Sequence, residues 1–284
     1  MLGRSGVASM RRYTGSAMET RALGTTGLTV PVIGMGTWQS YDVESATGIR
    51  PITDAALAAG ATFFDSSPMY GAAERMLAET LGPRRSKVVI ATKVWASSAR
   101  EGRQQIQRAL DWYGGTVDVY QIHNLEAWTI HLPYLEELQA AGRIRAIGIT
   151  HYSASAFDRM AEIVATGRVA VLQVPYNPRE REVERAILPL AAERRLGIIL
   201  MRPLGAGALA RTSPPARELG FLTAWGLTTW AQALLNWGVS DPRVSVSIPA
   251  TRNLGHARDN CAVGAARRFD AETRERVAAL ARRA

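Results

Sequence analysis

The feature that most constrains this fold is a regular alternation of short apolar runs with longer helical stretches, which begins at residue 28. The apolar runs predict strands at residues 28–35, 62–65, 88–94, 117–122, 144–150, 169–174, 197–201 and 244–248. Amphipathic, alanine-rich stretches predict helices at residues 45–59, 72–81, 99–113, 131–141, 153–166, 180–195, 227–238, 253–262 and 271–283. Most of the runs are continuously apolar, as in parallel strands covered by helices. Eight such repeats predict an α/β fold, a single-domain (β/α)8 TIM barrel over residues 18–284.

Two segments fall outside this alternation. Residues 1–17 carry no apolar period, and we expect a disordered leader there. Residues 205–225 form the longest irregular stretch and directly follow the seventh predicted strand. In a barrel this long loop would overhang the C-terminal face, where long loops are often functional.

Composition narrows the classes of partner. The chain has one cysteine, Cys261, so it forms no internal disulfide, and we expect a cytoplasmic location. The formal net charge is +9, but the basic residues are dispersed in pairs without interleaved aromatics, so we expect no nucleic-acid partner. No apolar stretch approaches the roughly 20 residues of a spanning helix, and we expect no membrane partner. The four histidines lack metal-ligand spacing, so no metal site is predicted.

Four titratable side chains lie at or just after the ends of three consecutive predicted strands: Asp65, Tyr70, Lys93 and His123. Barrel active sites form at the C-terminal ends of strands, so we expect these four to meet at one mouth. An ammonium about 4 Å from a tyrosine stabilises the phenolate by roughly 4 kcal/mol at an effective dielectric near 20. Asp65 would keep Lys93 charged, and His123 would hydrogen-bond a carbonyl oxygen beside Tyr70. The set suits protonation of an oxygen that becomes an alkoxide, as carbonyl reduction requires.

With these residues in place, the sequence resembles the aldo-keto reductase superfamily, in particular its bacterial-type NADPH-dependent members, over about residues 19–275. The matching motifs are Gly36-Thr37-Trp38, the segment from Asp65 to Gly71, Ala91-Thr92-Lys93, His123, Gln173, and the stretch from Ile248-Pro249 to Asp259-Asn260. The resemblance implies a (β/α)8 barrel with NADPH extended across its C-terminal face. It also implies hydride transfer to a small aldehyde or ketone, with Tyr70 as proton donor and the other three residues in support.

The resemblance further implies a set of cofactor-binding residues. They are Gly36, Thr37, Trp38, Thr150, His151, Gln173, Met201, Arg202, Leu204, Gly205, Pro249, Ala250, Thr251, Arg252, His256 and Asn260. The family often has asparagine where this chain has His151, and a stacking tyrosine where it has Met201. Near the 2′-phosphate, Ala250 and His256 replace the usual lysine and arginine, which leaves Arg252 as the permanent charge. We therefore expect NADPH to be preferred over NADH by a reduced margin.

The predicted substrate pocket is walled by Trp38, Trp95, Asn124, Trp128 and Trp225, which suits a flat, apolar carbonyl compound. Two alternatives stay open. The same barrel can serve as a cofactor-sensing binding or regulatory protein with little turnover, because a fold does not prove catalysis. A Schiff-base aldolase using Lys93 is the other alternative, and it requires a neutral lysine, which the neighbouring carboxylate disfavours.

Overall fold

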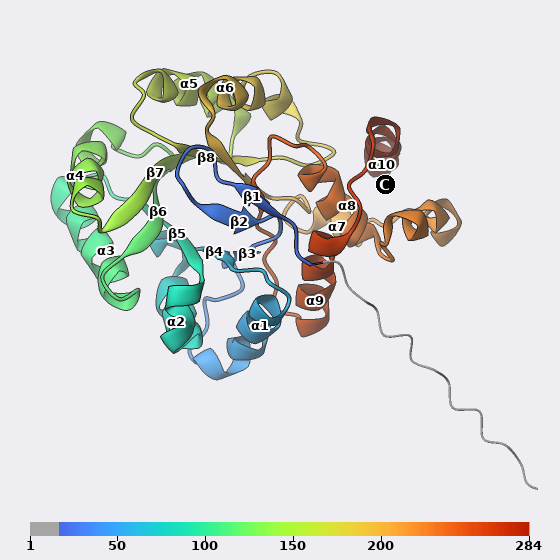
Figure 1. Ribbon diagram of the computed structural model, residues 1–284, viewed down its shortest axis with the longest axis horizontal. Helices are drawn as coiled ribbons and strands as arrows, with labels where there is room; N and C mark the ends of the chain where they lie inside the picture. The colour runs from blue at the N-terminus through green and yellow to red at the C-terminus, as the bar shows by residue number, and fades with distance from the viewer. Residues whose placement is uncertain (1–16, 284) are drawn as a thin grey trace, which may run out of the picture.

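The computed structural model of the protein describes residues 17–283, and sixteen of the seventeen residues of the predicted leader lie outside that range. Eight parallel strands form the centre of the molecule, each paired with the next along the chain (Figure 1). They are β3 (Met35–Gly36), β4 (Phe63–Asp65), β5 (Val89–Val94), β6 (Val117–His123), β7 (Ile144–Thr150), β8 (Val171–Pro175), β9 (Gly197–Met201) and β10 (Val246–Ser247). A parallel bridge between Ile33 and Ser247 closes the ring, which confirms the predicted (β/α)8 barrel.

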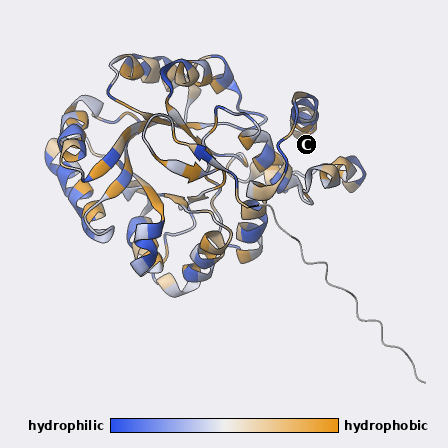
Figure 2. Cartoon of the chain, in the orientation of Figure 1, coloured by the Kyte–Doolittle hydropathy of each residue, from blue (hydrophilic) through white to orange (hydrophobic). Residues whose placement is uncertain are grey.

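Helices surround the barrel. They are α1 (Ala46–Ala58), α2 (Ala73–Leu81), α3 (Ala99–Trp112), α4 (Trp128–Ala140), α5 (Phe157–Ala165), α6 (Ile187–Arg194), α7 (Ala208–Arg211), α8 (Trp230–Val239), α9 (Leu254–Ala262) and α10 (Ala271–Arg283). Figure 2 shows apolar residues along the strands and polar residues on the outward helix faces, the pattern that the alternation predicted. Within residues 17–283, no helix has both the length and the apolar character needed to cross a membrane.

An antiparallel hairpin, β1 (Thr20–Ala22) and β2 (Thr29–Pro31), covers the N-terminal mouth of the barrel (Figure 1). Its apolar residues Leu23, Leu28 and Val30 are buried against barrel-interior residues such as Phe63 and Val119. Because the hairpin closes this end, the opposite, C-terminal end is left for a site.

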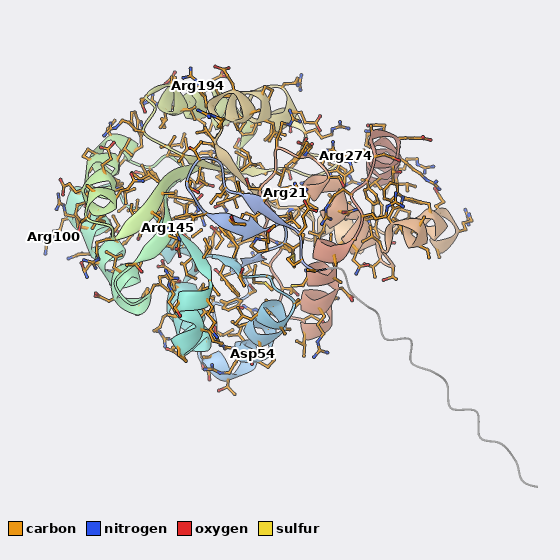
Figure 3. The ribbon with its side chains drawn as sticks, in the orientation of Figure 1. Arg21, Asp54, Arg100, Arg145, Arg194 and Arg274 are labelled. Atoms are coloured by element: carbon orange, nitrogen blue, oxygen red, sulfur yellow. The ribbon has the colours of Figure 1, made fainter. Side chains whose placement is uncertain are left out.

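Arg21, labelled in Figure 3, fastens the hairpin to the rest of the barrel. Its guanidinium donates to the backbone oxygens of Val239, Asp241 and Val244, at 2.8, 3.1 and 2.7 Å respectively. These three carbonyls lie between the end of α8 and the start of β10, so one side chain joins the hairpin to the segment that leads into the last barrel strand. The hairpin is therefore held by hydrogen bonds as well as by apolar burial.

The prediction of one strand over residues 28–35 was wrong. The structure divides this run into β2, which pairs in the hairpin, and β3, which pairs in the barrel. The backbone passes from one partner to the other just after Pro31: Val32 N still donates to Glu19 O at 2.9 Å in the hairpin, whereas Gly34 N donates to Ser247 O of the barrel at 2.8 Å. Leu28 and Val30 face the barrel interior from the hairpin. The periodicity of the sequence alone does not distinguish such a hairpin strand from a strand of the barrel.

The predicted helix at 180–195 is also divided. A short 3-10 turn, Glu182–Glu184, precedes α6, which begins only at Ile187. Pro189 lies in the first turn of α6, where its missing N–H costs nothing, but an earlier start would set its ring against the carbonyl of Arg185. The loop after β9, the seventh barrel strand, is long as predicted, and it contains α7 and two 3-10 turns, Ala216–Glu218 and Gly220–Trp225.

Candidate active site

A cavity of about 540 Å³ opens at the C-terminal end of the barrel. Its walls come from the ends of strands and the loops that follow them, including Gly36 at the end of β3, Asp65 at the end of β4 and Thr150 at the end of β7. Strand register brings these ends to one level, since His123 pairs with Thr150 and Thr150 pairs with Gln173. The barrel therefore gathers the predicted residues from distant parts of the chain.

Lys93 and Asp65 form a buried ion pair beneath this cavity. The Lys93 Nζ lies 2.7 Å from Asp65 Oδ2 and donates a second 2.7 Å hydrogen bond to the backbone oxygen of Ser66. The lysine is 0% exposed and the aspartate 2%. Gln121 Nε2 donates to the other aspartate oxygen at 3.2 Å, so both carboxylate oxygens are hydrogen-bonded.

Burial alone would lower the pKa of Lys93, but the facing Asp65 carboxylate, together with Tyr70 and Glu74, raises it. Lys93 is therefore an ammonium at neutral pH. A Schiff base requires the free amine as nucleophile, so this environment argues against the aldolase alternative.

Tyr70 lies above the ion pair, at the end of a 3-10 turn, Pro68–Tyr70. The Ser67 side chain caps this turn by accepting from Met69 N at 3.2 Å. The Lys93 Nζ is 5.3 Å from the centre of the Tyr70 ring. Burial raises the pKa of Tyr70, and the Lys93 charge opposes that rise. The ammonium is thus placed to stabilise a phenolate in a site that otherwise disfavours one.

His123, the last residue of β6, completes the group. Its ring stands at 90° to that of Tyr70, with 5.9 Å between centroids. Burial and the Lys93 charge lower the pKa of His123 to about 3, so the imidazole is neutral. Its Nδ1 lies 2.9 Å from Ser67 Oγ. Ser67 Oγ also accepts from Met69 N, and a hydroxyl that donates to Nδ1 would place the ring proton of the neutral imidazole on Nε2.

Most of the predicted cofactor-binding residues line the same cavity. They are Gly36, Thr37, Trp38, Thr150, Gln173, Met201, Arg202, Leu204, Pro249, Ala250, Thr251 and Arg252. Four others do not: His151, Gly205, His256 and Asn260. The His151 ring accepts from Ser153 N at 3.0 Å and stacks on Tyr152 at 5.0 Å, so it is engaged with its own loop.

The cavity walls have features that fit a nicotinamide dinucleotide. Gln173 Nε2 donates to Asp65 Oδ2 at 3.4 Å, and within the described chain its buried Oε1 has no hydrogen-bond partner. An oriented acceptor beside an open cavity suits the amino group of a carboxamide. Among the described residues, the basic side chains that line the cavity are Arg202 and Arg252, both suited to phosphate oxygens.

The predicted substrate wall is only partly formed by the predicted residues. Trp38 and Asn124 line the cavity, whereas Trp95, Trp128 and Trp225 do not. Trp225 instead packs edge-to-face on Phe269, with 5.3 Å between ring centroids. The Arg159 guanidinium lies 5.6 Å from the Trp128 ring centre.

Sequence reasoning missed several residues of the cavity wall. Met69 and Tyr152, 47% and 50% exposed, line it, as do Pro203 and Ala206 in the loop after β9. Tyr152 also lies under the Arg202 guanidinium, with 5.2 Å between its ring centre and Cζ. Their position directly after strand ends or motif residues was the sequence signal that could have identified them as wall residues. Within residues 17–283, no cluster of three or more His, Cys, Asp or Glu side chains forms a candidate metal site.

Comparison with known proteins places this geometry in a family. A sequence model of the Aldo/keto reductase family matches residues 32–282. The chain belongs to the aldo/keto reductase family of oxidoreductases.

Individual members of the family are moderately similar to this chain. Methylglyoxal reductase YeaE of Escherichia coli is 27% identical over 248 residues, which cover 83% of this chain and 86% of YeaE. L-galactose dehydrogenase of Arabidopsis thaliana is 30% identical over 224 residues, 70% of this chain and 69% of the plant protein. Aldo-keto reductase YhdN of Bacillus subtilis is 27% identical over 215 residues, and the match spans 64% of YhdN, just under two thirds of its length.

A solved structure supports the fold. The holo form of aldo-keto reductase AKR11C1 from Bacillus halodurans matches with a TM-score of 0.77 at 22% identity. The match covers 93% of this chain and 96% of that chain. This similarity agrees with the closed barrel described above.

Proposed function

We propose that this protein is an NADPH-dependent reductase that converts a small aldehyde or ketone to an alcohol, with Tyr70 as the proton donor. The observation that carries the proposal is the fully buried Lys93 ammonium, 2.7 Å from Asp65 and 5.3 Å from the Tyr70 ring, directly beneath an open cavity. One relative is named for methylglyoxal reduction and another as a sugar dehydrogenase, which supports small oxygenated substrates.

The proton step follows from this chain's own groups. A substrate carbonyl oxygen beside Tyr70 receives the tyrosine proton as negative charge develops on it, and Lys93 stabilises the phenolate left behind. The neutral His123 donates from Nε2 to the same oxygen and so orients the carbonyl. Asp65 keeps Lys93 charged and fixed. A bound nicotinamide would supply the hydride.

The cofactor-binding residues are proposed from the cavity walls. Gln173 and Thr150 would hold the carboxamide, Met201 would pack on the nicotinamide, and Arg202 would contact the diphosphate. The other predicted cofactor-binding residues lie in the loops around the cavity and in α9. In the loop after β10, Thr251 and Arg252 would bind the 2′-phosphate, and we propose a modest preference for NADPH over NADH.

The test is the loss of NADPH absorbance with a panel of aldehydes and ketones, run in parallel with NADH, for the wild type and for Tyr70→Phe. We expect Tyr70→Phe to bind NADPH normally and to lose about 10²–10⁴-fold in kcat, the usual contribution of general acid catalysis. Tyr134→Phe, on α4, is the matched control and should keep full activity.

Two results would count against the proposal. Retention of more than about half of kcat by Tyr70→Phe would refute the role of Tyr70. Tight NADPH binding by the wild type without turnover of any carbonyl in the panel would favour a cofactor-sensing protein instead.

A further inference from the structure

One buried acid near the site has so far been described only through its effect on the pKa of Lys93. Glu74, in the first turn of α2, is 3% exposed. Its carboxylate accepts a 2.5 Å hydrogen bond from Thr92 Oγ1, and within the described residues it forms no ion pair. Burying an unpaired carboxylate is costly, so its presence calls for a physical explanation.

The Glu74–Thr92 hydrogen bond joins the two segments that carry Tyr70 and Lys93. Glu74 follows Tyr70 by four residues, and α2 begins directly after the tight turn at Gly71. Thr92 precedes Lys93 on β5, and because side chains alternate along a strand, Thr92 faces α2 while Lys93 faces the barrel interior. The bond therefore fixes α2, and with it Tyr70, against the strand that holds the ammonium.

The charge of Glu74 acts on Lys93, whose pKa it raises. Asp65 and Lys93 together are neutral, so an ionised Glu74 makes the buried group net negative. Negative charge stabilises the Lys93 ammonium but disfavours a Tyr70 phenolate, whereas a protonated Glu74 removes that effect.

We infer that Glu74 is a positioning residue, an inference that rests on the proposed function. The protonation state of Glu74 sets the net charge beside Lys93, and thereby how readily Tyr70 gives up or takes back a proton. Reduction forms the Tyr70 phenolate, so a protonated Glu74 favours it. Alcohol oxidation starts from the phenolate as base, so an ionised Glu74 favours that direction. In this coupling between Glu74 and Tyr70, Glu74 gains or loses only its own proton and forms no bond to the substrate.

The surroundings of Glu74 allow it to titrate in the neutral range. The titratable or charged groups that act on it are Lys93 from β5 and Arg108 from α3, with the tyrosine hydroxyls of Tyr113 and Tyr120 beside it. Burial raises the pKa of Glu74 to about 7, and the Thr92 hydrogen bond holds it from rising further.

The experiment measures kcat for reduction and for alcohol oxidation from pH 6 to pH 8 in the wild type, Glu74→Gln and Glu79→Gln. We expect Glu74→Gln to match the wild type near pH 6. At pH 8 it should reduce faster and oxidise more slowly, each by about three- to tenfold, as the removal of one negative charge that acts through Lys93 would produce. Glu79, an exposed residue of the same helix paired with Arg75, is the matched control and should leave both profiles unchanged.

A merely structural role predicts a different pattern, because loss of alignment lowers both directions at every pH. That result, or wild-type profiles for Glu74→Gln, would overturn the inference. If Glu74→Gln does not fold, Thr92→Val serves instead. Loss of the Thr92 hydrogen bond should raise the pKa of Glu74 and so move the inflection of the kcat–pH profile to higher pH. An inflection at the wild-type pH would overturn the inference. Tyr70→Phe separates the two proposals, since an inactive Tyr70→Phe with an unaltered Glu74→Gln refutes only the role of Glu74.

Discussion

Replacing Lys93 by methionine should destabilise the protein by about 3 kcal/mol or more at pH 7, as well as remove activity. The lysine and Asp65 are 0% and 2% exposed and 2.7 Å apart, so the substitution leaves a buried carboxylate without its counter-ion. Breaking a buried pair in this way costs about 3–5 kcal/mol. The amide hydrogen bonds from Gln121 and Gln173 remain, which places the expected loss at the lower end.

Urea unfolding followed by circular dichroism at pH 7 and pH 5 measures this loss. The unpaired Asp65 should have a raised pKa in Lys93→Met, so the folded variant gains a proton as pH falls, and its deficit should shrink at pH 5. The double variant Lys93→Met/Asp65→Asn removes the buried charge and should recover most of the stability but none of the activity. Wild-type stability of Lys93→Met at pH 7, or a double variant no more stable than the single one, would refute the reasoning.

Three further predictions use other residues. Glu74→Gln should be more stable than the wild type at pH 8 by about 3 kcal/mol, and equally stable near pH 4.5. An acid whose pKa rises from 4.5 to about 7 on folding destabilises the folded state only as pH rises through that window. Urea unfolding at both pH values measures the difference in stability. Arg252→Ala should weaken NADPH binding more than NADH binding, by roughly tenfold, in fluorescence titrations, and equal losses would contradict its proposed contact with the 2′-phosphate. Gly24→Ala should lower the melting temperature clearly more than Gly27→Ala. Both glycines have positive φ, but a Cβ at Gly24 would collide with the backbone nitrogen of Gly197, whereas one at Gly27 would meet no atom of the described residues within 4 Å; similar melting temperatures would contradict this.

The barrel was predictable because its strands differ in character from its helices. Short, largely apolar runs such as 117–122 and 144–150 correspond closely to β6 and β7. The hairpin was not predicted, because β1 is three residues long and partly exposed, with no apolar pattern of its own. What makes β1 a strand is its pairing with β2 and the hydrogen bonds of Arg21, and neither is visible in local sequence.

The same limit applies to the candidate site. Asp65 and Lys93 were predicted to face each other because they end neighbouring strands, and the register of a parallel sheet brings such ends together. Trp225 was placed in the wall from its loop alone, but a loop without periodicity gives no direction for its side chains, and packing on Phe269 decides it. Glu74 was overlooked because an acid in the first turn of an amphipathic helix is ordinarily a solvent-exposed residue.

Lys93 and Glu74 are both buried charged or chargeable groups beside Tyr70, yet their removal should change stability in opposite directions at pH 8. Lys93 is compensated by a carboxylate at 2.7 Å, so its loss exposes the cost of burying Asp65. Among the residues that the structure describes, the Glu74 carboxylate accepts one hydrogen bond and has no ion-pair partner, so its loss removes a cost. A side chain that lowers stability at neutral pH and above, four residues from the proposed proton donor, is better explained by chemistry than by packing. If Glu74→Gln stabilises the protein at pH 8 and also flattens the pH dependence of reduction, both effects trace to the same proton.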